Sequence, residues 1–388
     1  MVRGIWSRHR TTAAIGAGGI LVVALIAAGL TISVLRGGPA ASTAATATLA
    51  TAGVSPSPTD STIPSALVPA TVPSSSTTPG PGWVYSDLDG VLAPPDLAHR
   101  LPMAIMIDDN AAARPQSGIS SASIVYQAYA DGGEDRYMFI FQEGTATDIG
   151  PVRSARPYYV YWADEYKPLY GHFGGDANSL QNVIPANSKN IYNMDDLSGG
   201  SCPYHRIGTR PAPHNAYTNT AVLITCAAKK GYPATYQNLP TRTFKDDEPI
   251  ADRPASQTIS VPYRTCTIGY RYDPATDSYL RSVDGKLQTD PANNEQVTAA
   301  SVIVLYQTVT YFDNSAIEPG HNSRPIVANV GSGKAVVFEE GAAIVGTWKK
   351  TSNTALTRLY DSSGNEIPLV RGEIFIQSVP PGTAVTYK

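Results

Sequence analysis

The stretch Pro102-Met-Ala-Ile-Met-Ile-Asp108 is an apolar run that ends in a carboxylate. A short apolar run bounded by polar residues is typical of a buried strand, so we predict a strand over Met103–Ile107. Similar runs predict three more strands nearby, at 124–129, 137–141 and 169–173. Strands of this kind with helices between them indicate an α/β region with a mixed sheet.

Three helices are predicted in the same region. The first spans 154–166, because Pro157 suits the first turn of a helix and no later position. The second begins near Asp176, a residue type that is favoured at helix N-caps. The third spans about 218–230 and stops at Gly231, since glycine commonly follows the last turn of a helix.

Beyond about residue 249 the sequence becomes a series of short β-prone runs separated by turn signals such as Asp284-Gly285. The chain holds 22 Tyr, 33 Gly and 31 Pro, a mixture that favours short strands and turns over long helices. We therefore predict an α+β fold: an N-terminal α/β domain at 83–245 with about three helices, then a β-rich meander domain at 250–388. Its strands are expected at 261–263, 268–272, 279–282, 301–311, 325–330, 335–338, 342–349, 356–360 and 373–377.

The N-terminal end predicts a membrane anchor. A basic tail at 1–10 contains Arg3, Arg8 and Arg10, and the following stretch, 11–35, carries no charge. As a helix this stretch would measure about 37 Å, enough to cross a hydrocarbon core of about 30 Å. It is longer than the apolar core of a cleavable signal peptide, so we expect an uncleaved signal anchor. Small residues in the range 40–47 leave cleavage open as an alternative.

The arginines are expected to stay in the cytoplasm, which places everything after the anchor on the extracellular side of a single-pass protein. From Gly37 to Gly82 the only charged residue is Asp60, and the rest is almost entirely Ala, Ser, Thr, Pro, Gly and Val. Such a composition cannot bury enough apolar surface to fold. We predict a disordered linker at 36–82.

Composition and motifs exclude several classes of function. The formal net charge of −3 gives no sign of nucleic-acid binding. Cys202, Cys226 and Cys266 suggest one disulfide and one spare thiol in an oxidising compartment, but the sequence does not choose the pair, and three unrelated buried cysteines are the alternative. The segment from Cys202 to His205 is half of a zinc site without a second pair of ligands, so no metal or other cofactor is predicted.

Acidic and glycine-rich segments supply the first candidates for a site. Asp108 stands at the end of a predicted strand, where carboxylates often act in catalysis or binding, although Asp also favours turns. Arg114 follows in the next segment. Asp131 precedes Gly132-Gly133 and Arg136, a pattern that also suits an ordinary hairpin turn.

The remaining candidate site residues are arginines, histidines and the residues beside them. Arg153 and Arg156 are three residues apart at the start of a predicted helix, where positive charge is unfavourable unless an anion is bound. The alternative is that both pair with internal carboxylates such as Asp108 or Asp131. Two further candidates are histidines beside backbone turns, each of which is also compatible with a structural role: His172 with Gly174 and Gly175, and His214 with Asn215.

Several stretches occur in a characteristic order: Pro102-Met-Ala-Ile-Met-Ile-Asp108, Ala113-Arg-Pro-Gln-Ser-Gly-Ile119, Ile124-Val-Tyr126, Gly132-Gly133 with Arg136, Gly150-Pro-Val-Arg-Ser-Ala-Arg-Pro157, His172-Phe-Gly-Gly175 and Ala212-Pro-His-Asn215. Together they resemble the signature of the YerB-like family, bacterial lipoproteins built from a domain of unknown function. The C-terminal half is similar to that family's second domain through Tyr270-Arg-Tyr-Asp273 and Gly346-Thr-Trp-Lys-Lys350. The resemblance covers about 83–388.

The resemblance implies an exported protein of the bacterial envelope and carries no established catalytic activity. Family members look like lipoproteins, whereas this sequence has no lipid-accepting cysteine after its apolar stretch. The anchor type is therefore where the chain departs from the family.

Two functions are compatible with these residues. The favoured one is binding of an anionic or glycan envelope ligand, or of a protein partner, through Arg114, Arg136, Arg153, Arg156, Gly174, Gly175 and Asn215. The alternative is a hydrolase or transferase acting on a cell-wall glycan or phosphodiester, with Asp108, Asp131, His172 and His214 as acid–base candidates. No recognised catalytic motif is complete, which favours the non-enzymatic function without settling whether the protein is an enzyme.

Overall fold

The computed structural model describes residues 80–195, 202–236, 238–312 and 324–388. The predicted anchor at 11–35 and nearly all of the predicted linker lie outside these residues. Among the described helices, none combines the length and the apolar character that a membrane span requires.

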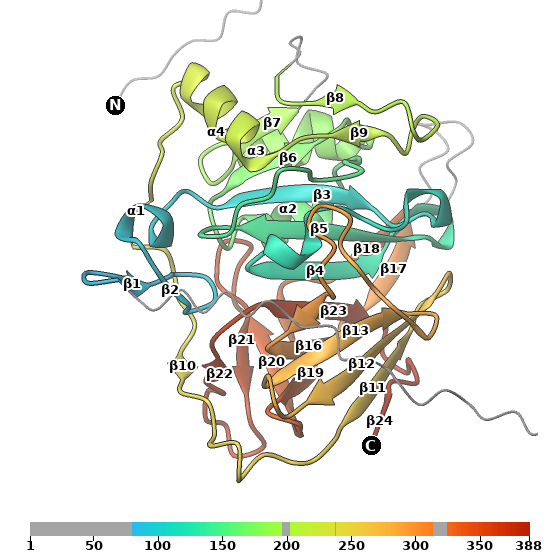
Figure 1. Cartoon of the computed structure of the whole chain (residues 1–388). Helices are drawn as coiled ribbons and strands as arrows, with labels where there is room; N and C mark the ends of the chain where they lie inside the picture. Colours follow the sequence, from blue (N-terminus) through green and yellow to red (C-terminus); the bar gives the residue numbers. More distant parts are fainter. Residues whose placement is uncertain (1–79, 196–201, 237, 313–323) are drawn as a thin grey trace, which may run out of the picture. The chain divides into compact units, whose positions relative to one another are not determined.

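A ten-stranded mixed sheet organises the described chain (Figure 1), and both halves of the sequence contribute to it. Its order is β21-β20-β19-β16-β23-β4-β5-β3-β6-β7. The N-terminal half supplies β3 (Met103–Asp108), β4 (Ile124–Tyr129), β5 (Asp135–Phe141), β6 (Leu169–His172) and β7 (Tyr192–Asp195). The C-terminal half supplies β16 (Ser301–Tyr306), β19 (Gly331–Glu339), β20 (Ala342–Lys350), β21 (Arg358–Tyr360) and β23 (Ile374–Val379).

The two halves meet where β23 pairs in parallel with β4, in register from Ile374 opposite Ile124 to Gln377 opposite Gln127. Every residue of both strands is buried. A strand that is covered on both faces reads as a continuous apolar run, which is why these segments are recognisable in the sequence.

A second sheet is entirely antiparallel, with the order β14-β13-β12-β11-β24 and β15 paired to β13. Its strands are β11 (Thr258–Pro262), β12 (Thr267–Asp273), β13 (Ser278–Val283), β14 (Lys286–Leu287), β15 (Thr298–Ala299) and β24 (Thr386–Tyr387). The consecutive strands β11 to β14 form the meander that the sequence predicts. The remaining long strands of the C-terminal half do not join this meander but extend the large sheet; they are β16, β19, β20, β21 and β23. Strand β16 is buried on both faces along nearly its whole length, and a strand of this kind must be covered on both faces.

Short strand pairs complete the described structure. They are β1 (Val84–Tyr85) with β2 (Leu92–Ala93), β8 (His205–Arg206) with β9 (Ala216–Tyr217), β10 (Phe244–Lys245) with β22 (Leu369–Val370), and β17 (Val309–Phe312) with β18 (Arg324–Val327). The single strand predicted at 301–311 is thus two strands, β16 and β17, which belong to different sheets.

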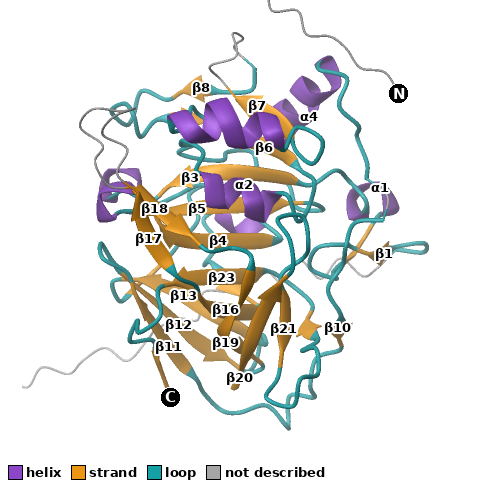
Figure 2. Ribbon diagram, turned by 180° about the vertical axis from the view of Figure 1, so that it is seen from behind, coloured by secondary structure: helices purple, strands orange, loops and turns teal. Residues whose placement is uncertain are grey.

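The large sheet has an apolar core on each face. Along β3, Met103, Ile105 and Ile107 face the core shared with the second sheet, whereas Ala104 and Met106 face the core beneath α2. This alternation follows from the two-residue period of a strand. Figure 2 shows α2 against the sheet, where Trp162 stacks on Tyr126 of β4 at 5.1 Å between ring centroids.

Four α-helices lie in the described residues: α1 (Pro95–Ala98), α2 (Pro157–Ala163), α3 (Ile184–Ala186) and α4 (Thr220–Lys229). The predicted helix at 154–166 starts only at Pro157, because Arg156 has the extended backbone of an N-cap residue. The helix predicted from Asp176 starts at residue 177, directly after this N-cap residue, and continues as the π-helix η4 (Ser179–Val183), which runs into α3. Asp176 still accepts hydrogen bonds from the backbone N and Oγ of Ser179, at 3.0 and 2.6 Å.

Cys202 and Cys226 form a disulfide with their Cα atoms 5.9 Å apart, and Cys266 is a buried free thiol. The bridge ties the chain before β8 to α4. The sequence predicts one disulfide and one spare thiol without choosing the pair, and the structure shows that Cys202 and Cys226 form the disulfide.

Replacing Cys202 and Cys226 together by alanine is expected to lower the free energy of unfolding by about 3 kcal/mol. The reason is that the bridge restricts the unfolded chain across a sequence separation of 24 residues. Urea denaturation in non-reducing buffer measures the loss. Reductant should reproduce it in the wild type and leave the double variant unchanged, whereas equal stability of the two proteins without reductant would contradict the prediction.

Candidate functional site

The segment 150–156 brings its two arginines to the carboxyl ends of the central strands. The backbone N of Arg153 donates to Met106 O at 2.9 Å, and Pro151 O accepts from Asp108 N at 2.9 Å. Further along, Ala155 N donates to Gly174 O at 2.9 Å. The segment therefore lies between the end of β3 and the end of β6.

Asp108, Arg153 and His214 converge at one point. The Oδ2 atom of the buried Asp108 lies 3.0 Å from Arg153 Nε and 2.6 Å from His214 Nδ1. Asn110 N donates to the other carboxylate oxygen at 3.1 Å. Asp108 thus fixes the orientation of a half-buried imidazole, as a carboxylate does in a catalytic Asp–His pair.

Asp131 forms the second point of convergence, with Arg156 and Arg324. Arg156 Nε donates to Asp131 Oδ2 at 2.9 Å, and Arg324 Nη1 contacts the same oxygen at 2.5 Å. Burial opposes the ionisation of Asp131, but the guanidinium groups of Arg156, Arg136 and Arg324 hold its pKa below the usual range. One carboxylate is therefore shared between two arginines.

Arg136 lies between these two groups. It is buried and donates from Nη1 to Ser154 O at 3.0 Å. Burial and the neighbouring Arg156 and Arg153 lower its pKa to about 10. Of the alternatives for Arg153 and Arg156, the structure shows internal pairing, with Asp108 and Asp131 respectively.

His172, Gly174 and Asn215 make structural contacts. Both ring nitrogens of the buried His172 are 2.7 Å from acceptors, Gly174 O and Asn193 Oδ1. Gly174 N donates to Asp195 Oδ1 at 3.1 Å, so this amide is already used. The side chain of Asn215 contacts Arg206 and Ile207 and holds its own loop. A role for these residues in binding or catalysis stays a prediction.

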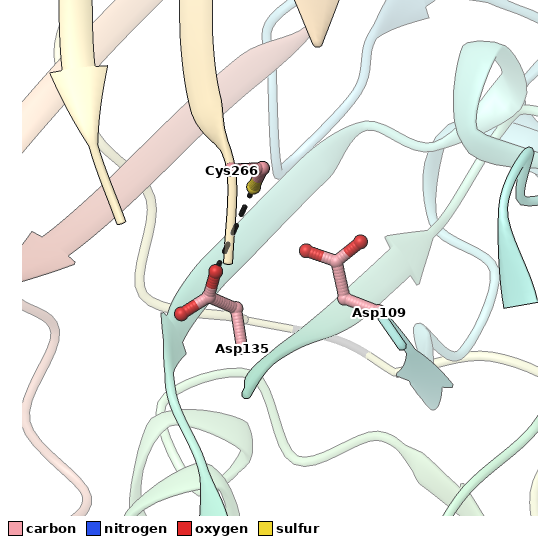
Figure 3. A group of neighbouring side chains, drawn as sticks. All are labelled: Asp109, Asp135 and Cys266. Carbon is pink, nitrogen blue, oxygen red and sulfur yellow. Dashed lines mark hydrogen bonds between the residues drawn. The ribbon is translucent and has the colours of Figure 1, made fainter. Parts of the chain in front are cut away.

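A third cluster contains Asp109, Asp135 and Cys266, whose ligand atoms lie within 4.8 Å of one another (Figure 3). Cys266 Sγ is 3.7 Å from Asp135 Oδ2. Burial, then the neighbouring Asp109, raises the pKa of Asp135 well above its usual range. Burial, with the charge of Asp109, also raises the pKa of Cys266 to about 12. In the absence of a metal ion the thiol of this cluster is therefore protonated at neutral pH.

The contacts of Asp109 also weigh against a metal ion in this cluster. Its Oδ1 accepts from Arg114 Nε at 2.8 Å and from Gln116 Nε2 at 2.9 Å, and its Oδ2 accepts from Gln127 Nε2 at 3.1 Å. Both oxygens are thus engaged by donors. Arg114, predicted to bind a ligand, here serves as the counter-ion of a buried carboxylate.

A cavity of about 260 Å³ opens beside Arg156 and Arg324, and we call it the Arg156–Arg324 cavity. Part of its lining comes from residues 176–182, which include the first residues of η4, and part comes from β17 and β18. Its lining consists of Arg156, Pro157, Asp176, Ala177, Asn178, Gln181, Asn182, Phe312, Arg324, Pro325 and Ile326.

Sequence reasoning finds Arg156 but not the other walls of this cavity. For one part of the lining the sequence does contain a signal, the amide-rich run from Asn178 to Asn182. This run lies within a predicted helix, and the helix prediction alone does not mark it as part of a site. Phe312 and Arg324 stand far along the chain, and only the fold brings them to Arg156.

Two family models match the chain. One, described as "Protein of unknown function (DUF3048) N-terminal domain", matches residues 88–233, and its C-terminal counterpart matches residues 259–376. "Putative lipoprotein YerB" of Bacillus subtilis (strain 168) is 28% identical over 297 residues, which cover 76% of this chain and 85% of that protein. The crystal structure of YerB from Bacillus subtilis aligns with a TM-score of 0.69 at 26% identity, covering 79% of this chain and 99% of that one.

Proposed function

Because the chain belongs to the YerB-like family of proteins of unknown function, we propose that it is a membrane-tethered binding protein of the bacterial envelope. Its ligand, anionic or a glycan, occupies the Arg156–Arg324 cavity. The lipoprotein name of the Bacillus subtilis relative favours a place at the outer face of the membrane. The basic tail and the uncharged stretch at 11–35 favour the same topology with a helix in place of a lipid.

The observation that carries this proposal is the chemistry of the cavity. Concave sites that combine apolar walls with a few convergent polar groups are where small ligands bind. Here two guanidinium groups and three amide side chains line the cavity together with apolar residues of β17 and β18. Phe312 and Ile326, which are 50% and 45% exposed, line the cavity together and give it an apolar surface that a ligand or partner can cover.

Replacing Phe312 by alanine is expected to reduce binding of the extracytoplasmic part to isolated bacterial cell walls at least fivefold. The ring forms part of the cavity wall and is half exposed, so its removal should not unfold the protein. A co-sedimentation assay over a range of protein concentrations measures binding.

The matched control is Ile250→Ala, which removes another exposed apolar side chain that does not line the cavity. It should bind like the wild type. Equal binding by Phe312→Ala and Ile250→Ala would show that the cavity is not the binding site. Absence of binding by the wild type would overturn the proposed function.

The enzymatic alternative has one observation in its favour, the 2.6 Å contact between Asp108 and His214. Neither residue belongs to the lining of the Arg156–Arg324 cavity. The same wall incubation separates the alternatives when soluble fragments are measured. We expect no release, whereas release by the wild type and not by His214→Gln would establish hydrolysis.

A further inference from the structure

We propose that a second cavity, which we call the Arg114–Lys286 cavity, binds the C-terminal residue of a short peptide through its carboxylate group. The cavity measures about 530 Å³, within the range of about 300–1,000 Å³ that is typical of small-ligand sites. Its lining comes from residues 114–116 and from residues 283 and 286–289. Among the described residues, none lines both this cavity and the Arg156–Arg324 cavity.

The cavity lies where the two family domains meet. Residues 114–116 belong to the N-terminal family model, and residues 283–289 belong to the C-terminal one. Buried side chains connect the two parts, since Gln288 Nε2 lies 3.4 Å from Gln116 Oε1. Small ligands bind preferentially at such junctions between domains. Both halves of the chain are therefore required to form the site.

The charge of the lining favours an anion. Its described residues include two cations, Arg114 and Lys286, and no acid. Lys286 is exposed on β14, and its side chain has no ion-pair or hydrogen-bond partner in the part of the chain that the structure describes. The neighbouring acid of the same turn, Asp284, accepts from Thr267 N at 2.8 Å and does not line the cavity. The Lys286 ammonium group can therefore pair with a ligand.

Arg114 provides donors of a second kind. Its Nε atom donates to Asp109 Oδ1 at 2.8 Å, which holds the side chain in place. Of the two terminal nitrogens, Nη2 lies 3.4 Å from Thr265 Oγ1, and Nη1 has no hydrogen-bond partner among the described residues. Two parallel N–H donors of a guanidinium group match the two oxygens of a carboxylate. The edge that Nη1 and Nη2 form thus suits a carboxylate even though Asp109 occupies Nε.

Two buried amides in the lining suit a peptide group. Gln116 and Gln288 are 1% and 6% exposed. Gln116 Nε2 donates to Asp108 O at 3.0 Å and to Asp109 Oδ1 at 2.9 Å, and Gln288 Oε1 accepts from Arg281, so both amides have a fixed orientation. Gln288 Nε2 keeps one N–H without a partner among the described residues, and Gln116 Oε1 can accept a further bond. A peptide group offers the matching acceptor and donor.

The apolar part of the lining suits the side chain of the same ligand residue. It consists of Pro115, Val283 and Leu287, and Leu287 is 59% exposed. Covering this leucine removes apolar surface from water, which favours binding. A carboxylate, a peptide group and an apolar side chain occur together in the last residue of a peptide.

Titration calorimetry on the purified full-length chain tests the inference with four probes. They are N-acetyl-alanyl-leucine, its C-terminal amide, acetate and inorganic phosphate. We expect N-acetyl-alanyl-leucine to bind at least fivefold more tightly than each of the others. The amide lacks the charge, acetate lacks the peptide group and the side chain, and phosphate tests for a general anion site. A smaller preference over any of the three, or no binding at all, would overturn the inference.

Variants connect the result to the cavity. Lys286→Gln should weaken binding of N-acetyl-alanyl-leucine at least fivefold, whereas Lys286→Arg should keep most of the affinity because it keeps the charge. The matched control is Lys229→Gln, which changes an exposed lysine of α4 outside the lining and should bind like the wild type. Leu287→Ala should weaken binding at least threefold. Circular dichroism confirms that each variant is folded, and wild-type affinity in a folded Lys286→Gln protein would overturn the inference.

This inference and the proposed function fail separately. Phe312→Ala changes the Arg156–Arg324 cavity and should leave binding of N-acetyl-alanyl-leucine unchanged. Weaker peptide binding by Phe312→Ala would place the peptide in the other cavity and overturn the inference. Failure of the wild type to bind cell walls, with peptide binding intact, would overturn only the proposed function.

Discussion

Replacing Arg281 by alanine is expected to lower the free energy of unfolding by about 4 kcal/mol. Arg281 lies on β13, is fully buried and donates to Gln127 Oε1 at 3.0 Å and to Tyr137 OH at 2.9 Å. It also donates to Tyr270 of the neighbouring strand β12 and to Gln288, which follows β14. The alanine variant leaves these buried polar partners without a donor and opens a cavity, and changes of this kind cost about 3–5 kcal/mol.

The loss should be large because Arg281 connects the two sheets. Its guanidinium group lies 5.4 Å from the ring centroid of Tyr137 on β5 and 5.4 Å from that of Phe375 on β23. It also supports the charge of Asp109, whose pKa burial raises and whose ionisation Arg114 and Arg281 favour. The side chain therefore contacts strands from both halves of the large sheet.

Urea denaturation at pH 7 measures the effect. Arg271→Ala is the matched control, because Arg271 lies on the neighbouring strand β12 and is exposed. The control should change stability by less than about 0.5 kcal/mol, as surface substitutions usually do. Similar midpoints for Arg281→Ala and Arg271→Ala would contradict the structural role of Arg281.

Replacing Asp164 by asparagine is expected to stabilise the protein at pH 8 by up to about 4 kcal/mol and to change little at pH 4. Asp164 is the C-cap residue of α2, and neither oxygen of its buried carboxylate has a hydrogen-bond partner among the described residues. Burial raises its pKa to about 7, although Lys350 opposes the shift, and Glu165 adds to it.

The direction of this change in stability with pH follows from the raised pKa of Asp164. The folded protein binds a proton at Asp164 more tightly than the unfolded chain does, whose carboxyl has a pKa of about 3.9. The stability that the neutral carboxyl contributes is complete below pH 4 and is lost as the pH rises through 7. A difference of about three pH units corresponds to about 4 kcal/mol. Asparagine stays neutral throughout, so its advantage should grow over that interval.

Thermal melts of both proteins between pH 4 and pH 8 measure this difference. Asp96→Asn, an exposed acid-to-amide change on α1, is the matched control and should follow the wild type at every pH. A constant difference between Asp164→Asn and the wild type over the whole range would show that Asp164 does not titrate in this interval.

Much of the secondary structure follows from the sequence, because the central strands are apolar on both faces. Ile124–Tyr129 is a strand with the predicted bounds, and Met103–Ile107 is extended only by Asp108. The helix predicted at 218–230 is observed as Thr220–Lys229, with Asn219 accepting from Val222 N at 2.8 Å as its cap. Local propensity and capping determine these elements, so a local reading of the sequence finds them.

The arrangement of the strands does not follow from the sequence. Parallel pairing of β23 with β4 joins segments that are about 250 residues apart, and no local signal specifies such a contact. The same holds for the candidate site. The pairing of Arg153 and Arg156 with acids is among the alternatives that the sequence offers, but the wall that Phe312 and Arg324 provide depends on how β17 and β18 are placed. Non-local packing therefore determines both.

The parallel ladder between β23 and β4 makes each half of the chain dependent on the other. Without the C-terminal half, β4 would present an unpaired apolar edge to water, and without the N-terminal half, β23 would do the same. Such edges recruit other chains and aggregate. Each half produced on its own should therefore aggregate, and the boundary between the two family models at about 233–259 is not a place where the molecule can be divided.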